Sequence, residues 1–268
     1  MYDFNYVCAS SIEEAAKALG QEGAQIISGG QTLIPTLKQR LANPTTLVSV
    51  GSIEEIKRIS VNAGGVMTIG AAATHNQVCL QGIKFPALAA LAGKIGDPAV
   101  RYRGTIGGSL ANNDPAACYP AAILACKSEI ITNFRVIDSS KFFIGMFETI
   151  LEEKEIILQI RLNIPEVANY QKFEQPASRF ALVGVFVCRY LDHVKVAVTG
   201  AAETGVFRWT EAEDALTEDF TENKLLGLNI EGVDMISDIH GSSAYRRSLI
   251  TTLTSRAVAK CLEVATVK

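Results

Sequence analysis

Two short glycine-rich stretches are the parts of this 268-residue chain whose residue types and spacing best suggest chemistry. The first, ISGGQTLIP, spans residues 27–35, and the second, GTIGGSLANNDPAA, spans residues 104–117. Each stretch has glycines beside a predicted helix start, and because glycine has no side chain, a ligand can approach the backbone closely there. The first N–H groups of a helix have no partner within the helix, so they can bind a diphosphate. Both stretches therefore predict a ligand that contacts the backbone.

The first stretch combines Gly29 and Gly30 with Gln31 and Thr32, which place polar side chains where the chain turns toward a ligand. It has neither the dinucleotide fingerprint G-x-G-x-x-G nor the phosphate-loop spacing. Taken alone, it is a weak signal for a ligand, and a turn that only begins a helix explains it better.

The second stretch adds polar side chains that would be costly to bury without partners. Pro115 suits the first turn of a helix predicted over PAACYPAAILA, with Asp114 as its N-cap. A purely structural turn is the alternative. If the two stretches face each other, they predict a dinucleotide held between two lobes, and their spacing does not separate FAD from NAD. The polar and glycine residues concerned are Gly104, Gly107, Gly108, Ser109, Asn112, Asn113 and Asp114.

Composition and charge exclude several other classes of protein. Hydrophobic residues make up 48% of the chain, charged residues 20%, and the formal net charge is -3, which is typical of a globular domain without affinity for nucleic acid. The longest apolar run, residues 181–188, is too short to span a membrane, and the first residues do not resemble a signal peptide. We therefore expect a cytoplasmic protein with no membrane insertion.

The cysteines and histidines do not suggest a metal site or a nucleophile. The six cysteines form no C-x-x-C pair, and the three histidines, His75, His193 and His240, stand far apart. We expect most thiols to be buried. Any chemistry should come from a bound cofactor.

The elements that must position the glycine stretches can be read from hydrophobic periodicity. A strand over residues 4–9, a helix over 10–19 with a capping box at Ser11 and Glu14, and strands over 24–28 and 45–50 predict an N-terminal α/β unit. A hairpin at Gly64 and Gly65, helices over 85–95 and 119–130, and strands over 128–134 and 155–164 follow. Two paired strands over 179–191 and 194–202 and a long helix over 242–265 close the chain. Residues Tyr245, Leu249, Leu253, Ala257 and Cys261 form the apolar stripe of that helix.

Four stretches in this order, SGGQTLIP, VRYRGTIGGSLANNDPAA, YQKFEQPASRFALVGVFV and SSAYRRSLITTLTSRAVAK, resemble the FAD-binding medium subunit of molybdenum hydroxylases. The resemblance implies an α+β fold in three parts. A small N-terminal FAD-binding lobe would span residues 1–53, and a larger mixed α/β lobe residues 54–168. A C-terminal α+β domain with a three-stranded antiparallel sheet and helices would span residues 169–268.

The same resemblance implies a function and partners. The chain would bind FAD non-covalently and pass electrons from the [2Fe-2S] clusters of a small subunit to an external acceptor, with molybdopterin on a large subunit. The heterotrimer would be able to dimerise. A stand-alone FAD-dependent oxidoreductase and a non-catalytic interaction module are the alternatives. The substrate and the acceptor, whether NAD, quinone or oxygen, are not encoded in these residues.

The family's cofactor contacts map onto both glycine stretches and onto four further positions. Two departures stand out: Cys118 occupies a position where the family commonly has an aspartate that accepts hydrogen bonds from the cofactor, and Arg179 also replaces an aspartate. A thiol is a poor acceptor, so Asp114 or a backbone carbonyl must compensate, or FAD binds more weakly. The predicted cofactor-binding residues are Ile27, Ser28, Gly29, Gly30, Gln31, Thr32, Leu33, Ile95, Thr105, Ile106, Gly107, Gly108, Ser109, Asp114, Cys118, Ile157 and Lys172.

Overall fold

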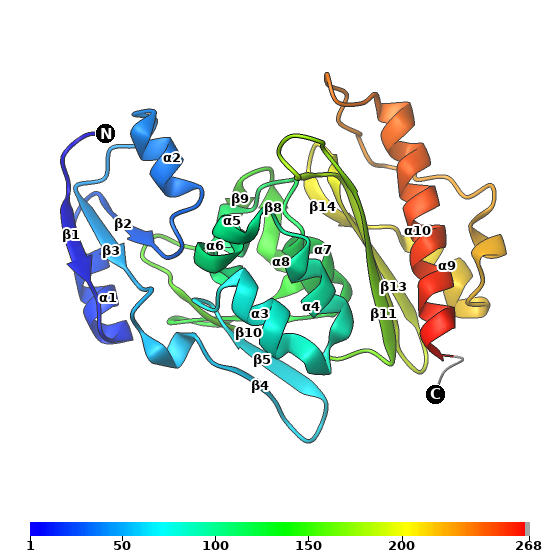
Figure 1. Ribbon diagram of the computed structural model, residues 1–268, viewed down its shortest axis with the longest axis horizontal. Coiled ribbons are helices and arrows are strands. Elements are labelled where there is room, and N and C mark those ends of the chain that lie inside the picture. The colour runs from blue at the N-terminus through cyan, green and yellow to red at the C-terminus, as the bar shows by residue number, and fades with distance from the viewer. Residues whose placement is uncertain (266–268) are drawn as a thin grey trace.

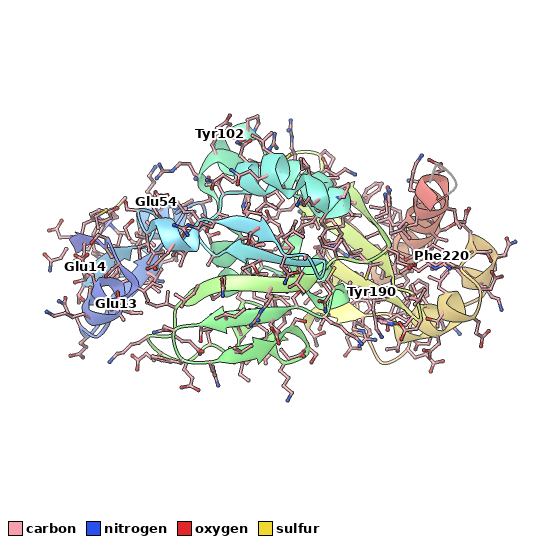
Figure 2. All side chains as sticks on the ribbon, turned by 90° about the horizontal axis from the view of Figure 1, so that it is seen from below. Glu13, Glu14, Glu54, Tyr102, Tyr190 and Phe220 are labelled. Atoms are coloured by element: carbon pink, nitrogen blue, oxygen red, sulfur yellow. The ribbon has the colours of Figure 1, made fainter. Side chains whose placement is uncertain are left out.

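Three main β-sheets follow one another along the chain and lie side by side in a row (Figure 1). The computed structural model describes residues 1–265, with side chains up to Glu263. The end of the third predicted part, residues 266–268, lies outside the described residues. Viewed from below, Glu13 and Glu14 mark one end of the row and Phe220 lies toward the other (Figure 2). Among the described helices, none is long and apolar enough to cross a membrane.

The N-terminal lobe is a three-stranded parallel sheet in the order β1-β3-β2. Helix α1 begins as predicted, because the Ser11 side chain accepts the Glu14 amide at 3.1 Å. The Glu14 carboxylate, however, accepts from the amide and hydroxyl of Ser10 rather than from Ser11, so only half of the capping box forms. The elements are β1 (Asn5–Cys8), α1 (Ile12–Leu19), β2 (Ala24–Ile27), α2 (Leu33–Lys38) and β3 (Thr46–Ser49).

The middle lobe is built on a five-stranded antiparallel sheet in the order β4-β5-β10-β6-β7. The predicted hairpin at Gly64 and Gly65 is confirmed, since it joins β4 to β5. The strands are β4 (Ile59–Val61), β5 (Val66–Gly70), β6 (Glu129–Thr132), β7 (Val136–Asp138) and β10 (Ile157–Asn163), with the small pair β8 (Phe143–Gly145) and β9 (Glu148–Thr149). The helices are α3 (His75–Gln81), α4 (Pro86–Gly93), α5 (Pro98–Arg103), α6 (Ile106–Asn112), α7 (Tyr119–Ala125) and α8 (Ser139–Phe142).

The predicted helix over residues 115–125 forms, but the prediction that it begins at Pro115 is wrong. Helix α7 begins at Tyr119, and the Asp114 carboxylate accepts the Ala116 amide at 2.8 Å in a local turn instead of capping a helix. The cause is a distant strand: the Thr199 hydroxyl reaches the carbonyls of Pro115 and Ala117 at 2.8 and 2.7 Å, and the Gly200 amide donates to Pro115. The Pro115 carbonyl already accepts two hydrogen bonds, so it is not free to accept the Tyr119 amide, as a helix that began at Pro115 would require.

The C-terminal domain has a four-stranded antiparallel sheet in the order β11-β12-β13-β14, so the expected three-stranded sheet is wrong by one strand. After a tight turn, residues 205–208 fold back on β13, pairing Arg208 with Ala197 and Phe207 with Val198. A register shift interrupts this pairing between Val198 and Ala202. The elements are β11 (Val167–Glu174), β12 (Ala181–Arg189), β13 (Val194–Ala202), β14 (Gly205–Arg208), α9 (Thr210–Glu218) and α10 (Ser243–Ala265).

The C-terminal sheet is covered on both faces. Helix α10 packs on β11 and β12 from the outside, and α4 and α7 of the middle lobe pack on the other face (Figure 1). Residues 181–188 of β12 are therefore buried without alternation, which explains their continuous apolar run. The predicted stripe of α10 is buried at Leu249, Leu253, Ala257 and Cys261, while Tyr245 is 43% exposed.

Candidate functional site: a cleft between the first two lobes

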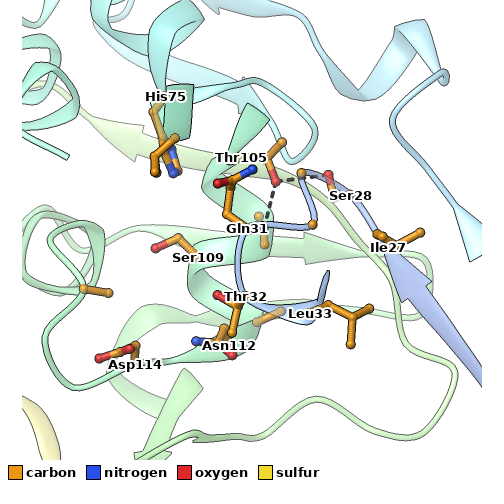
Figure 3. A pocket seen from close by; sticks show the side chains of 18 of the residues that line it. Ile27, Ser28, Gln31, Thr32, Leu33, His75, Thr105, Ser109, Asn112 and Asp114 are labelled. Carbon is orange, nitrogen blue, oxygen red and sulfur yellow. Dashed lines mark hydrogen bonds between the residues drawn. The ribbon is translucent and has the colours of Figure 1, made fainter. Parts of the chain in front are cut away.

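The two glycine stretches are in direct contact although they belong to different lobes. A side chain at Gly29 would overlap the carbonyl oxygen of Arg103 and lie 2.7 Å from the Cα of Gly104. Beside this contact, the Thr105 hydroxyl donates to the Ser28 hydroxyl at 3.0 Å (Figure 3). Glycine at position 29 is thus required for the lobes to meet at this point.

The first stretch presents a run of backbone donors without protein partners. Within the part of the chain that the structure describes, no protein atom accepts a hydrogen bond from the amides of residues 29–33. Gly30 has a φ of +72°, which turns the chain into helix α2, and its carbonyl accepts the Ile34 amide at 3.0 Å. Five consecutive free N–H groups at a strand-to-helix corner can bind a diphosphate.

The second stretch differs, because its amides are already engaged. Ile106 and Gly107 donate to the carbonyls of Ala73 and Ala71 at 3.1 and 2.9 Å. Gly108 donates to the Thr105 hydroxyl at 3.2 Å, which caps helix α6. The glycines here serve close packing: a side chain at Gly107 would lie 2.6 Å from the side chain of Ala71. This stretch forms a wall that the first stretch faces.

The polar residues at the C-terminal end of α6 and just after it divide into two groups. Asn112 and Asp114 line the space between the lobes. Asn113 does not: it ends α6 with a φ of +41°, is 1% exposed, and its amide group donates to the carbonyls of Gly145 and Glu148 at 2.7 and 2.9 Å. Asn113 therefore anchors the helix to the β8–β9 turn.

A cleft of about 600 Å³ opens between the two stretches and extends to the C-terminal domain. Its volume is in the range of small-molecule and cofactor sites. Of the predicted contact residues, Ile106 does not line it, because its side chain is fully buried in the core of the middle lobe. Those that do line it are Ile27, Ser28, Gly29, Gly30, Gln31, Thr32, Leu33, Ile95, Thr105, Gly107, Gly108, Ser109, Asp114, Cys118, Ile157 and Lys172.

A buried ammonium group lies at the far side of the cleft. The side chain of Lys172, on β11, is 1% exposed, and its Nζ donates to the Lys94 carbonyl at 2.7 Å. Its nearest carboxylate, that of Glu174, is 3.7 Å away. Burial raises the pKa of the neighbouring Cys118 thiol, although Lys172 opposes this shift, so the thiol is neutral. The positive charge in the cleft therefore has only weak compensation.

Several lining residues were not predicted from the sequence. Arg179, to which the sequence assigned no role, lines the cleft with a φ of +59°, together with its neighbours Ser178 and Phe180 from the C-terminal domain. His75 lines it as well, and burial, helped by the charge of Arg101, lowers the pKa of its ring to about 4. Arg179 lies in one of the four family stretches, where it replaces an aspartate, but nothing in that stretch gave the arginine a role. His75 stands in no motif, so the sequence carried no signal for it.

A comparison with protein families identifies the kind of protein that has this cleft. Residues 2–166 match the family described as FAD binding domain in molybdopterin dehydrogenase. The chain belongs to this family. The match covers the two lobes that form most of the cleft, and it confirms the family inferred from the four sequence stretches.

Relatives extend the likeness over the whole chain. The carbon monoxide dehydrogenase medium chain of Hydrogenophaga pseudoflava is 29% identical, with 95% of this chain and 96% of that chain covered. The alpha subunit of the 6-hydroxypseudooxynicotine dehydrogenase complex of Paenarthrobacter nicotinovorans is 30% identical, with 98% and 95% covered. Quinoline 2-oxidoreductase from Pseudomonas putida 86 has a chain with a TM-score of 0.89, 27% identity and 98% of both chains covered. The expected α+β fold is thereby confirmed.

The residues of the cleft fit FAD, the cofactor of this family. The free amides of residues 29–33 suit its diphosphate, and the missing side chain of Gly29 leaves the loop close enough to the second lobe to enclose it. Ile95 and Ile157 provide apolar walls for a ring system. In the described residues, no group of histidine, cysteine or carboxylate side chains could hold a metal ion.

Proposed function

We propose that this chain is the FAD-carrying electron-transfer subunit of a molybdenum hydroxylase complex. In this complex, electrons would come from [2Fe-2S] clusters on a small partner subunit, with molybdopterin on a large one, and would leave the chain for an external acceptor. The names of the relatives support this assignment, since they denote a medium chain and a complex subunit of dehydrogenases.

The observation that carries the proposal is the run of unpartnered amides from Gly29 to Leu33 facing a second lobe across a cleft. Bound FAD would supply the redox chemistry, and the protein would supply binding, orientation and electrostatics. The amides would hold the diphosphate, and the Ser109 hydroxyl and Asn112 side chain line the same wall. The chain therefore contributes a preorganised cradle.

Lys172 would contribute fixed positive charge beside the cofactor. Its ammonium is held by the Lys94 carbonyl, so it needs no movement to act on a bound ligand. Because the facing thiol of Cys118 is neutral, this charge favours electron density on a nearby ring. A Lys172→Met variant should bind FAD with a more negative reduction potential than the wild type.

The proposal is tested by purifying the tagged full chain from its native host. We expect it to carry flavin and to be accompanied by two chains, one rich in iron and acid-labile sulfide and one containing molybdenum. Reduction of the flavin by an organic substrate should require both chains. A full chain that reduces its flavin with such a substrate alone would favour the stand-alone oxidoreductase, and one that takes up no FAD would refute both.

A further inference from the structure

The imidazole of His75 occupies an unusual place in the wall of the cleft. His75 is the first residue of helix α3, is 5% exposed, and lines the cleft near Thr105 and Gln31 (Figure 3). Gly104 makes room for the ring, since a side chain there would lie 2.5 Å from Nε2. The Gly104 carbonyl also accepts the His75 amide at 2.9 Å. The ring is thus built into the junction of the two lobes.

Neither ring nitrogen has a hydrogen-bond partner among the described residues. Nδ1 is fully buried without a partner, whereas Nε2 remains accessible at the cleft side. The nearest aromatic group, Tyr119, lies with its ring centroid 5.4 Å away, and its hydroxyl is also unpartnered. Buried polar atoms are nearly always paired. Because Nδ1 is closed off, Nε2 is the ring nitrogen that a ligand in the cleft can reach.

The surroundings of His75 determine the charge of its ring and which ring nitrogen carries the proton. Burial opposes a positive charge on the ring most strongly. The Arg101 guanidinium, held by the carbonyls of Ile95 and Gly96, and the start of helix α3 add to this effect. The imidazole is therefore neutral and carries one N–H. Since burying an N–H without a partner is costlier than burying an acceptor, the proton belongs on Nε2. His75 consequently offers a neutral donor to the cleft.

We propose that His75 is a binding residue for FAD and that its Nε2–H donates a hydrogen bond to an acceptor atom of the cofactor. The proposal rests on FAD being the ligand of the cleft. A neutral donor suits an uncharged acceptor, such as a ring carbonyl, a ring nitrogen or a hydroxyl, rather than the diphosphate, which the amides of the first glycine stretch would hold.

The wild-type full chain allows a direct test, because it has only three histidines. Chain labelled with nitrogen-15 histidine reports the tautomer of each ring by NMR, and a His75→Asn variant assigns the His75 signals. We expect the Nε2–H tautomer for His75 without FAD. On addition of FAD, the Nε2 signal should shift while those of His193 and His240 stay in place.

Binding measurements complete the test. His75→Phe, which removes the donor but keeps a ring, should raise the Kd for FAD about fivefold to tenfold, as expected for one lost hydrogen bond. The matched variant His240→Phe, at an exposed position outside the cleft lining, should bind FAD like the wild type. Unchanged His75 signals together with unchanged affinity of His75→Phe would overturn the proposal and leave the FAD site intact. Failure of the wild type to bind FAD would instead overturn the proposed function.

Discussion

The Thr105 hydroxyl joins the two lobes and caps a helix at the same time. It donates to the Ser28 hydroxyl at 3.0 Å and accepts the Gly108 amide at 3.2 Å. Through this one oxygen, the orientation of α6 and the position of the first glycine stretch are coupled, so the shape of the cleft depends on it.

Removal of the two hydroxyls separately should resolve these roles. Ser28→Ala deletes only the bond between the lobes and should lower the free energy of unfolding by about 1 kcal/mol. Thr105→Val deletes the same bond and also the cap of α6, so it should lower the free energy of unfolding by about 1 kcal/mol more than Ser28→Ala. Urea denaturation followed by circular dichroism measures both values. Equal losses for the two variants would mean that the cap contributes nothing.

Gly29→Ala should weaken FAD binding and also lower the stability of the fold. The added methyl group overlaps the Arg103 carbonyl, so the lobes must separate at the cleft, and overpacking of this kind costs about 1–3 kcal/mol. The matched control is Gly64→Ala in the β4–β5 hairpin, where the nearest atom, Oδ1 of Asn62, would be 3.4 Å away. Thermal unfolding and FAD titration of both variants check the expectation, which fails if the two behave alike.

Cys118→Asp should strengthen FAD binding. The neutral, buried thiol is a weak acceptor, whereas a carboxylate accepts charge-assisted hydrogen bonds and would be compensated by Lys172. One such bond contributes about 1.5–3 kcal/mol, so we expect at least a tenfold lower Kd. Cys118→Asn has the same size without the charge and should give a smaller gain. Weaker binding by Cys118→Asp would show that burial of the carboxylate outweighs these contacts.

Acid should destabilise the chain through His75. The pKa of its ring is about 4 in the folded protein, below the value of 6.5 expected when unfolded. The unfolded chain therefore binds this proton first, and stability falls as the pH drops from about 6.5 toward about 4. Integrating this difference predicts a loss of about 2 kcal/mol by pH 5. His75→Phe should lack this component, which unfolding curves at pH 7 and pH 5 would reveal as a smaller pH dependence.

The sequence by itself determined the features that depend on neighbouring residues. The cap at Ser11, the hairpin at Gly64 and Gly65 and the turn into α2 after Gly30 follow from local backbone preferences, and the structure contains all three. The same holds for the pairing of β12 with β13, because two apolar, β-branched runs on either side of the short turn at Asp192 and His193 predict a hairpin. The four family stretches were likewise sufficient to identify the family, which the match over residues 2–166 confirms.

Only the tertiary structure decided how the polar groups of that cleft are used. Ala71 and Ala73 take up the amides of Ile106 and Gly107, and Thr199, on β13, takes up carbonyls that would otherwise begin a helix at Pro115. Gly104, distant in sequence, makes room for His75. Burial and the choice of hydrogen-bond partner depend on segments that meet only after folding, so local residue patterns cannot reveal which donors remain free for a ligand.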